Sequence, residues 1–241
     1  MNVLNLIRKS GKKIALLLDT DKADEKHLKS LINQSKKAKV DFIFVGGSFI
    51  TKNNFSQVIE FLKRNSKIPV VIFPGSVIQL DDKADAILFL SLISGRNPEM
   101  LIGNHIIAAP FLKHSGIEVI PTGYILIESG VSTGVVYMSN TVPIPYNQDA
   151  IAAHTALAGE YLGLKMMYID AGSGAMKTVS ESMIAAIKKN ISLPLVVGGG
   201  IRTTEAAVAC CRAGADIIVI GNAFEKDLSL LPKIANAVHN C

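Results

Sequence analysis

The stretch Pro194-Leu-Val-Val-Gly-Gly-Gly-Ile-Arg202 decides the fold, and Asp216-Ile-Ile-Val-Ile-Gly-Asn222 repeats its arrangement of an apolar run followed by glycine. Neither run alternates polar and apolar residues, which is typical of a parallel strand covered on both faces. The segment 203–213 between them has a helical pattern. A strand, a crossover helix and a second strand form a βαβ unit. The last part of the chain therefore predicts parallel strands that alternate with helices.

The same alternation extends back to the beginning of the chain. Six further strands are predicted, at 14–18, 42–45, 69–73, 86–90, 118–127 and 165–170. Helical patterns are found around 28–32 and at 54–64, 98–114, 149–162 and 178–189, with a last one at 224–239. Eight βα units in 241 residues match the arithmetic of a TIM barrel. A doubly wound sheet of this length is the structural alternative.

The connection after the third strand breaks the pattern, because 76–83 is too short for a full helix. We therefore predict an α/β fold, a single modified TIM (β/α)8 barrel with a missing or irregular third helix. No linker or low-complexity segment divides the chain. Residues 1–241 are accordingly predicted to form one domain.

The composition excludes several classes of protein. Hydrophobic residues make up 49% of the chain and charged residues 19%, so there is ample apolar material for a large core, which excludes disorder. The net charge of +5 is small. A nucleic-acid-binding protein usually gathers its positive charge on one stripe with aromatic residues between. We expect no nucleic-acid partner.

Cysteine usage and hydropathy indicate the compartment. Cys210, Cys211 and Cys241 have no metal-ligand spacing and form no disulfide framework, which favours a reducing environment. The longest apolar stretch, 87–93, is far shorter than a membrane span. We expect a cytoplasmic protein, and the sequence leaves contact with a membrane surface open.

Glycine is concentrated where the last two strands end, in Gly198-Gly-Gly200 and at Gly221-Asn222. Glycine lets backbone N–H groups approach an anion without interference from a Cβ atom. Loops after strands seven and eight form a phosphate site in many TIM barrels. Ala171-Gly-Ser-Gly-Ala175 after strand six adds amides and the Ser173 hydroxyl. The sequence therefore predicts a phosphate site at this end of the barrel.

Two carboxylates and a hydroxyl follow other strands at the same end. Asp170 ends strand six, where it can accept a hydrogen bond from a substrate hydroxyl, take a proton, or cap the following turn. Asp19 ends strand one, and Mg²⁺ typically binds through one or two carboxylates plus substrate phosphates. Ser48, after Gly46-Gly47, falls in the same quadrant. Together Asp19 and Ser48 predict a site for a metal-bound diphosphate.

Motifs along nearly the whole chain carry a family resemblance. They are Leu18-Asp-Thr-Asp-Lys22, Val45-Gly-Gly-Ser48, Ser91-Leu-Ile-Ser-Gly-Arg-Asn-Pro98, Pro121-Thr-Gly-Tyr124, Thr141-Val-Pro-Ile-Pro145, Tyr168-Ile-Asp-Ala-Gly-Ser-Gly-Ala175, Val197-Gly-Gly-Gly-Ile-Arg202 and Gly221-Asn222. In this order they resemble the geranylgeranylglyceryl phosphate synthase family, and more closely its second group, found in archaea and some bacteria. The glycine motifs are generic to phosphate-binding barrels, whereas the motifs ending at Tyr124 and Ala175 are more specific.

The resemblance implies a prenyltransferase with a modified TIM barrel that lacks a regular third helix. Its reaction is the Mg²⁺-dependent transfer of a polyprenyl group, geranylgeranyl by the family's name, from its diphosphate to the sn-3 hydroxyl of sn-glycerol 1-phosphate. The products are an ether lipid precursor and diphosphate. The resemblance also implies a homo-oligomer, either a dimer or a hexamer.

Site residues are carried over on the same motifs. Asp19 and Ser48 would bind Mg²⁺, and Asp170 and Tyr124 would be the catalytic residues. The residues implied to bind glycerol phosphate are Tyr168, Ile169, Asp170, Ala171, Gly172, Ser173, Gly174, Gly199, Gly200, Gly221 and Asn222.

The chain departs from the family at two positions. Leu17 stands where some relatives carry lysine, which removes one phosphate contact, and Asp170 stands where many have glutamate, which shortens a base by one methylene. The prenyl tail needs a long apolar groove. We predict that Phe73, Ile78 and Leu92 line it near the gap left by the third helix, with an ordinary core position as the alternative for each.

Two other functions stay open at this point. A sugar-phosphate isomerase or lyase of histidine or tryptophan biosynthesis would share the phosphate site and use Asp19 and Asp170 as an acid/base pair. A non-catalytic sensor of a phosphate ligand would need neither carboxylate for turnover. An apolar groove and Mg²⁺ dependence would argue against the isomerase or lyase.

Overall fold

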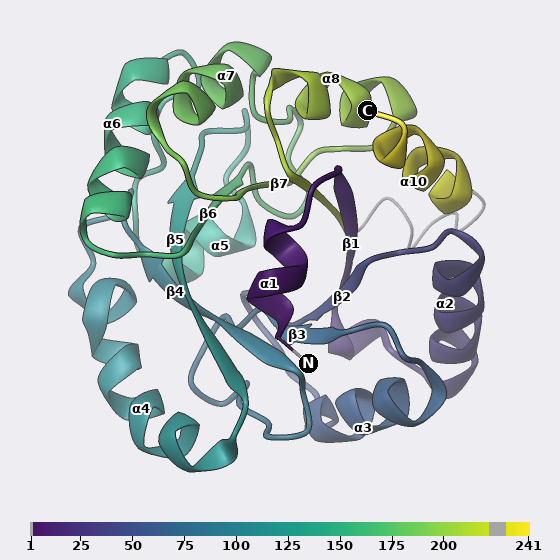
Figure 1. Ribbon diagram of the computed structural model, residues 1–241. Helices are drawn as coiled ribbons and strands as arrows, with labels where there is room; N and C mark the ends of the chain where they lie inside the picture. The colour runs from purple at the N-terminus through teal and green to yellow at the C-terminus, as the bar shows by residue number, and fades with distance from the viewer. Residues whose placement is uncertain (1, 222–229) are drawn as a thin grey trace.

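The barrel predicted from the sequence is confirmed. The structure, a computed structural model, describes residues 2–221 and 230–241. Eight parallel strands pair in chain order and close between the first and the last (Figure 1). They are β1 (Lys13–Leu18), β2 (Phe42–Val45), β3 (Val70–Ile72), β4 (Ala86–Leu92), β5 (Glu118–Leu126), β6 (Met166–Asp170), β7 (Leu195–Gly198) and β8 (Ile217–Ile220). The alternative of an open doubly wound sheet is excluded by this closure.

Helices surround the strands in the order expected. They are α2 (Glu25–Lys37), α3 (Phe55–Asn65), α4 (Asn104–Ser115), α6 (Asp149–Tyr161), α7 (Glu181–Asn190), α8 (Thr204–Ala213) and α10 (Leu231–His239) (Figure 1). A π-helical turn, η2 (Glu99–Gly103), leads into α4. The last helix was predicted from residue 224, and its first part lies outside the described residues. Residues 73–85 between β3 and β4 form no helix, which confirms the irregular third connection.

The core has two layers because side chains alternate along each strand. Phe42 and Phe44 of β2 point into the barrel and pack with Leu88 and Tyr168, whereas their neighbour Ile43 packs outward against the helices. All five side chains are essentially inaccessible to solvent. The inner layer fills the barrel, so a ligand can enter only at its rim.

Side-chain caps fix where several helices begin. Asp24, Ser180 and Thr203 accept hydrogen bonds from backbone N–H groups in the first turns of α2, α7 and α8. Such caps satisfy donors that have no partner within the helix. The loops that precede these helices leave the carboxyl ends of β1, β6 and β7, so the caps also limit the length of the loops that form the rim.

A short helix that the sequence analysis did not predict closes the other end of the barrel. It is α1 (Val3–Arg8), which lies across the barrel opening at the centre of Figure 1. Val3 and Ile7 are buried against the inner layer. The Glu118 carboxylate accepts hydrogen bonds from the N–H groups of Val3 and Leu4 at the helix start. A six-residue helix is too short to produce a clear periodic pattern.

A second short helix, α5 (Gly134–Ser139), lies in the segment between β5 and α6 that the sequence predicted to be a loop. Its end is tied to the loop after β4, because the Asn97 side chain donates to the Ser139 carbonyl at 2.7 Å. A Cβ atom on Gly134 would lie 3.2 Å from the Ser48 hydroxyl oxygen. The helix is therefore held over the rim, next to the loop after β2.

The closing helix generates a first prediction. Ile7→Ala removes a side chain that is 2% exposed and leaves a cavity below the inner layer, so the free energy of unfolding should fall by about 3 kcal/mol. Urea unfolding measures this difference. Asn5→Ala, on the exposed side of the same helix, is the matched control and should change stability little. Equal stability of the two variants would show that α1 does not close the barrel.

Candidate active site

Two cavities open at the carboxyl ends of the strands and meet there. The first is the more polar of the two, has a volume of about 1100 Å³ including its open part, and lies over the centre of the barrel. The second is apolar, has a volume of about 770 Å³ on the same measure, and runs outward past β4. Their walls share Ser48, Pro74, Gly75, Leu90, Tyr124 and Val135. We call the first the polar cavity and the second the apolar groove.

Most of the predicted site residues line the polar cavity. They are Asp19, Ser48, Tyr124, Tyr168, Asp170, Gly172, Ser173, Gly174, Gly199, Gly200 and Gly221. Barrel closure thus brings the β1 end, with Asp19, and the β7 end, with Gly199, to one cavity. Leu17 also lines it.

Two of the predicted residues that the structure describes do not line the polar cavity. Ile169 and Ala171 are buried in the outer core instead, and the Ala171 N–H donates to the Gly198 carbonyl at 3.1 Å. Their side chains face outward because successive residues along and just after β6 point to opposite sides of the barrel wall, and their contact with a ligand stays a prediction. Asn222 lies outside the described residues.

The loops predicted to bind phosphate are built on glycines with left-handed backbone. Gly199 and Gly200 have φ of +82° and +73°, and a Cβ atom on Gly199 would lie 2.6 Å from Asp170 Oδ1. A side chain there would be both strained and in collision with the carboxylate. The two glycines therefore let the loop after β7 approach the loop after β6, where amides of both loops can face one anion.

Asp170 is held by two donors inside the polar cavity. The Tyr124 hydroxyl donates to Oδ2 at 2.6 Å, and the Gly172 N–H donates to Oδ1 at 2.8 Å. Burial raises the pKa of Asp170, although both hydrogen bonds act in the opposite direction. Burial and the nearby Asp170 charge raise the pKa of Tyr124 and of Tyr168 well above the ordinary tyrosine value. The tyrosines stay neutral, and Asp170 is a stronger base than an exposed aspartate.

An aromatic cluster separates this carboxylate from the apolar groove. Phe73 stacks on Tyr168 with ring centroids 5.0 Å apart, and its edge faces Tyr124 at 5.9 Å. Tyr124 and Tyr168 are themselves 5.5 Å apart. The rings fix the Tyr124 hydroxyl on Asp170 and form a rigid apolar wall at the point where the two cavities meet.

Asp19, at the end of β1, and Ser48, in the loop after β2, line the part of the polar cavity that adjoins the end of β8. Asp19 accepts a hydrogen bond from the Asp21 N–H at 3.0 Å, and its second oxygen is 3.4 Å from the Lys22 ammonium. Among the described residues there is no group of three or more His, Cys, Asp or Glu side chains that could hold a metal ion. A cation here would need oxygen atoms from the substrate to complete its ligands.

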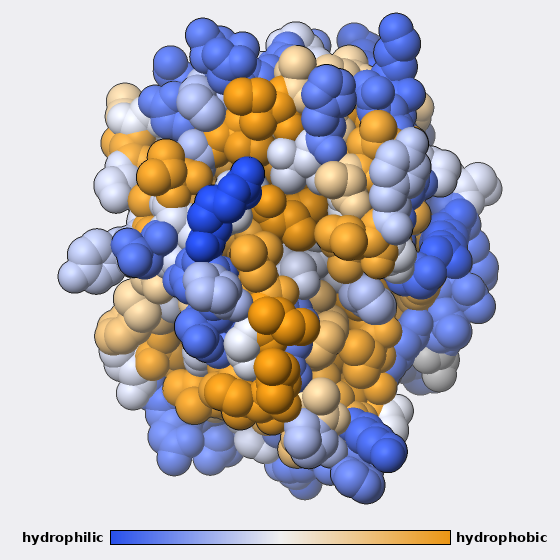
Figure 2. Space-filling view, turned by 90° about the vertical axis from the view of Figure 1, so that its left-hand side faces the viewer, coloured by the Kyte–Doolittle hydropathy of each residue, from blue (hydrophilic) through white to orange (hydrophobic). Residues whose placement is uncertain are grey.

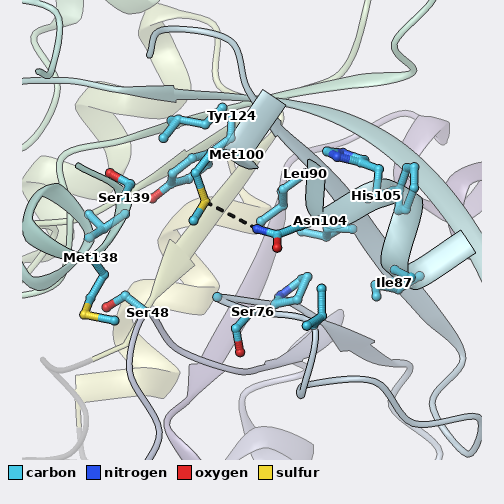
Figure 3. A pocket seen from close by; sticks show the side chains of 18 of the residues that line it. Ser48, Ser76, Ile87, Leu90, Met100, Asn104, His105, Tyr124, Met138 and Ser139 are labelled. Atoms are coloured by element: carbon cyan, nitrogen blue, oxygen red, sulfur yellow. Dashed lines mark hydrogen bonds between the residues drawn. The ribbon is translucent and has the colours of Figure 1, made fainter. Parts of the chain in front are cut away.

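The apolar groove occupies the place of the missing helix. Figure 3 shows side chains from β4, the turn after β3, α4 and α5 around an open space, with Ser48 at one side and Ile87 at the other. Of the three residues predicted to line it, Leu92 does so and Phe73 lines the polar cavity instead. Ile78 is 74% exposed and lines neither, because the irregular segment turns its side chain to solvent.

Several wall residues escaped the sequence analysis. His105 is buried in the groove wall, where its Nε2 is 3.1 Å from the Ser91 hydroxyl and burial lowers its pKa. Met100 lies one helical turn before Asn104, which donates weakly to its sulfur at 3.8 Å (Figure 3). Arg202 lines the polar cavity and donates to the Ala175 carbonyl at 2.7 Å, which ties the loops after β7 and β6 together. Arg202 could have been predicted from the sequence, because it ends the glycine motif after strand seven.

The fold and the two cavities define a class of protein, a TIM barrel with a glycine-lined polar cavity beside an apolar groove. A family model described as the PcrB family matches residues 7–238. The chain belongs to the PcrB family.

Named relatives agree with this assignment. A geranylgeranylglyceryl phosphate synthase of Chitinophaga pinensis is 52% identical over 231 residues, which cover 96% of this chain and 92% of the relative. One from Thermococcus kodakarensis is 43% identical over 212 residues, 88% and 83% of the two chains. These names confirm the predicted family and the prediction of a prenyltransferase enzyme.

A solved structure of the same kind has the same fold. The (S)-3-O-geranylgeranylglyceryl phosphate synthase of Thermoplasma acidophilum, in complex with its substrate sn-glycerol-1-phosphate, has a TM-score of 0.94 and 34% identity over the whole of both chains. A thiamine phosphate pyrophosphorylase from Pyrococcus furiosus shares the fold alone, with a TM-score of 0.60 and 12% identity.

Asp170→Asn is expected to stabilise the fold at about pH 8. Because burial raises the pKa of folded Asp170 above the unfolded value, the ionised carboxylate lowers stability at every pH above the folded pKa. This cost decreases as the pH falls through the folded pKa toward the ordinary value of 3.8. Urea unfolding should therefore show an advantage of the variant that shrinks as the pH is lowered.

The matched control is Asp216→Asn at the other end of the barrel. Asp216 accepts from Lys188 at 2.6 Å and from the Leu195 N–H at 2.9 Å, so loss of its charge should lower stability instead. Asp170→Asn could instead be less stable than the wild type both at pH 8 and at the lowered pH. In that case the hydrogen bonds from Tyr124 and Gly172 outweigh the cost of burial, and the prediction is wrong.

Proposed function

We propose that the protein is a Mg²⁺-dependent geranylgeranylglyceryl phosphate synthase. It transfers a geranylgeranyl group from its diphosphate to the sn-3 hydroxyl of sn-glycerol 1-phosphate. The observation that carries the proposal is the junction of the two cavities, where Ser48, Gly75 and Tyr124 belong to both walls. A substrate that is ionic at one end and apolar along the rest of its length fits across this junction.

The phosphate of sn-glycerol 1-phosphate is assigned to the glycine loops. Gly199 and Gly200 from one loop and Ser173 and Gly174 from another face the polar cavity, and Arg202 adds a positive charge to its wall. Backbone amides and a guanidinium are the donors that phosphate oxygens accept from most readily. Held there, the glycerol portion extends toward Asp170 and Tyr124.

Asp170 orients the attacking hydroxyl and takes its proton. The hydroxyl oxygen forms a bond to C1 of the prenyl group, the bond from C1 to the diphosphate oxygen breaks, and the diphosphate leaves with the electron pair. The proton of the hydroxyl passes to the Asp170 carboxylate, whose raised pKa suits this role. Phe73 and Tyr168 both line the polar cavity, where their aromatic rings would stabilise positive charge developing at C1.

The donor set of Asp19 and Ser48 fits Mg²⁺. Asp19 supplies a carboxylate and Ser48 a hydroxyl, both on the polar cavity, and a diphosphate would supply the remaining oxygens. When bound, the ion neutralises charge on the diphosphate and improves it as a leaving group.

The apolar groove takes the prenyl tail. Its wall is built from Leu92, Phe89, Val77 and Ala108 among others, and it begins beside Ser48 where the diphosphate would lie. A sugar-phosphate isomerase or lyase has no use for such a groove, so the groove favours the prenyltransferase over that alternative. Its product is an amphiphile, and we propose that it leaves by brief contact of the rim with a membrane surface in the cytoplasm.

We also propose that the chain forms a homo-oligomer. Figure 2 shows apolar side chains gathered on the side of the barrel that carries α4 and α6. Ile106 and Ile107 on α4 are 67% and 62% exposed there, and Tyr161 at the end of α6 is 81% exposed. Exposed apolar area of this kind is typical of a subunit interface.

Among the described residues no helix is both long enough and apolar enough to span a membrane.

The decisive experiment measures release of inorganic diphosphate from geranylgeranyl diphosphate, with either enantiomer of glycerol phosphate and with or without Mg²⁺. Turnover is expected with sn-glycerol 1-phosphate and Mg²⁺. Absence of turnover with both enantiomers in the presence of Mg²⁺ would end the proposal and favour a non-catalytic sensor of a phosphate ligand.

Asp19→Ala should lower kcat/KM by at least about 100-fold, because stabilisation of the leaving diphosphate by a metal amounts to several kcal/mol. The fold should be unaffected, since Asp19 lies on the rim outside both core layers. Asp24→Ala is the matched control. It removes an exposed carboxylate in the same loop, and this carboxylate caps α2. Full activity of Asp19→Ala would show that the metal assignment is wrong.

Tyr124→Phe should move the acid limb of the kcat/KM profile to higher pH. Activity decreases as the pH is lowered, because Asp170 becomes protonated. The hydrogen bond from Tyr124 lowers the pKa of Asp170, so removal of this hydrogen bond raises that pKa further. Tyr168→Phe serves as the control, because the described contacts include no hydrogen bond from its hydroxyl to Asp170. An acid limb at the same pH in Tyr124→Phe would argue against Asp170 as the base.

A further inference from the structure

One buried polar side chain in the irregular third connection is not part of either substrate site. Gln79 follows the turn after β3, is 2% exposed, and lies below the loops that leave β2 and β3. It lines neither the polar cavity nor the apolar groove. A buried amide away from the ligands needs a structural reason, because burying it without partners is costly.

Both polar atoms of the Gln79 side-chain amide form hydrogen bonds. Its Oε1 accepts from the Gly47 N–H at 3.3 Å and from the Gly75 N–H at 3.1 Å. Its Nε2 donates to the Gly47 carbonyl at 2.8 Å. Gln79 therefore pairs with Gly47 as a neighbouring strand would, and it joins the loop after β2 to the loop after β3.

The two joined loops touch through their backbones. A Cβ atom on Gly75 would lie 2.1 Å from the Gly47 carbonyl oxygen and 2.8 Å from the Ser48 Cα atom. A Cβ atom on Gly46 would lie 2.0 Å from the Phe73 carbonyl oxygen. There is no room for a side chain between the loops. Gln79 lies beside them and joins them through its terminal amide.

Ser48 and Gly75 lie at the top of this contact, where the polar cavity meets the apolar groove. In an ordinary barrel a helix after β3 would anchor this edge. Here the helix is missing, the groove occupies its place, and the Gln79 hydrogen bonds are what tie the loops together.

We propose that Gln79 is a positioning residue for the diphosphate end of the prenyl substrate. It holds Ser48 and the Gly75 backbone in the arrangement that receives the diphosphate, and it has no part in binding the phosphate of sn-glycerol 1-phosphate. The proposal rests on the function proposed above, because it assigns the Ser48 side of the polar cavity to the diphosphate.

Glutamine is the side chain that this contact requires. The site needs an acceptor for two backbone N–H groups and a donor for one carbonyl, and a primary amide supplies both. Glutamate would keep the acceptors and lose the donor, so a carboxylate oxygen would face the Gly47 carbonyl. Methionine has a similar length and volume and would make none of the three bonds.

The experiment measures binding of inorganic pyrophosphate with Mg²⁺ to the intact protein by calorimetry, with sn-glycerol 1-phosphate already saturating. In Gln79→Met the Kd for pyrophosphate should rise about tenfold, because buried backbone groups lose their partners and the loops shift. The Kd for sn-glycerol 1-phosphate alone should change less than about twofold. In steady-state assays the KM for geranylgeranyl diphosphate should rise correspondingly.

Asp216→Asn is again the control, since it weakens a partly buried polar contact at the far end of the barrel and should leave the Kd for pyrophosphate unchanged. Gln79→Glu is the second variant, for use if Gln79→Met does not fold, and it should also weaken pyrophosphate binding. Thermal unfolding of all variants separates loss of stability from loss of binding.

The outcomes separate this proposal from the function on which it rests. An unchanged Kd for pyrophosphate in the Gln79 variants, or an equal weakening of both ligands, would overturn the positioning role. A wild-type protein that turns over no prenyl diphosphate would overturn the proposed function. In that case the pyrophosphate comparison still decides whether Gln79 shapes an anion site beside Ser48.

Discussion

Closure of the barrel between β1 and β8 is the constraint on which the rest of the structure depends. The strands pair from Lys13 with Ile217 to Leu16 with Ile220, which joins the first strand to the last. Because all strands are parallel, their carboxyl ends form one rim. Residues as distant in the sequence as Asp19 and Gly199 thereby line one cavity. An open sheet would have left the proposed metal side and the phosphate loops at separate edges.

The site combines two environments that a single pocket could not provide. The proposed reaction needs amides, a cation and a carboxylate in the polar cavity, whereas the groove beside it needs apolar walls. The missing helix after β3 resolves this conflict, because it opens the barrel wall to the side and leaves the phosphate loops on the other side intact. The aromatic cluster of Phe73, Tyr124 and Tyr168 forms the boundary between the two environments. It also holds the Tyr124 hydroxyl that donates a hydrogen bond to Asp170.

Much of the site was predictable because its residues follow strands. Strand ends in a parallel barrel share a rim, so glycine and carboxylate at those positions identify the cavity without knowledge of contacts. The differences have physical reasons. Ile169 and Ala171 were included because they belong to a motif, but strand alternation turns them outward. Short helices α1 and α5 have too few residues for a periodic signal, and His105 and Gln79 are single polar residues whose surroundings come from distant segments.

The sequence by itself determined the parallel barrel, the irregular third connection and most residues of the polar cavity, since each depends on local periodicity or on the end of a strand. Only the tertiary structure decided where the groove runs, which of Phe73, Ile78 and Leu92 lines it, and that Tyr124 and Gly172 hold the Asp170 carboxylate. These features depend on distances between segments far apart in the chain. Hydrophobic pattern fixes which face of an element is buried, but it carries no information on which distant side chain meets that face.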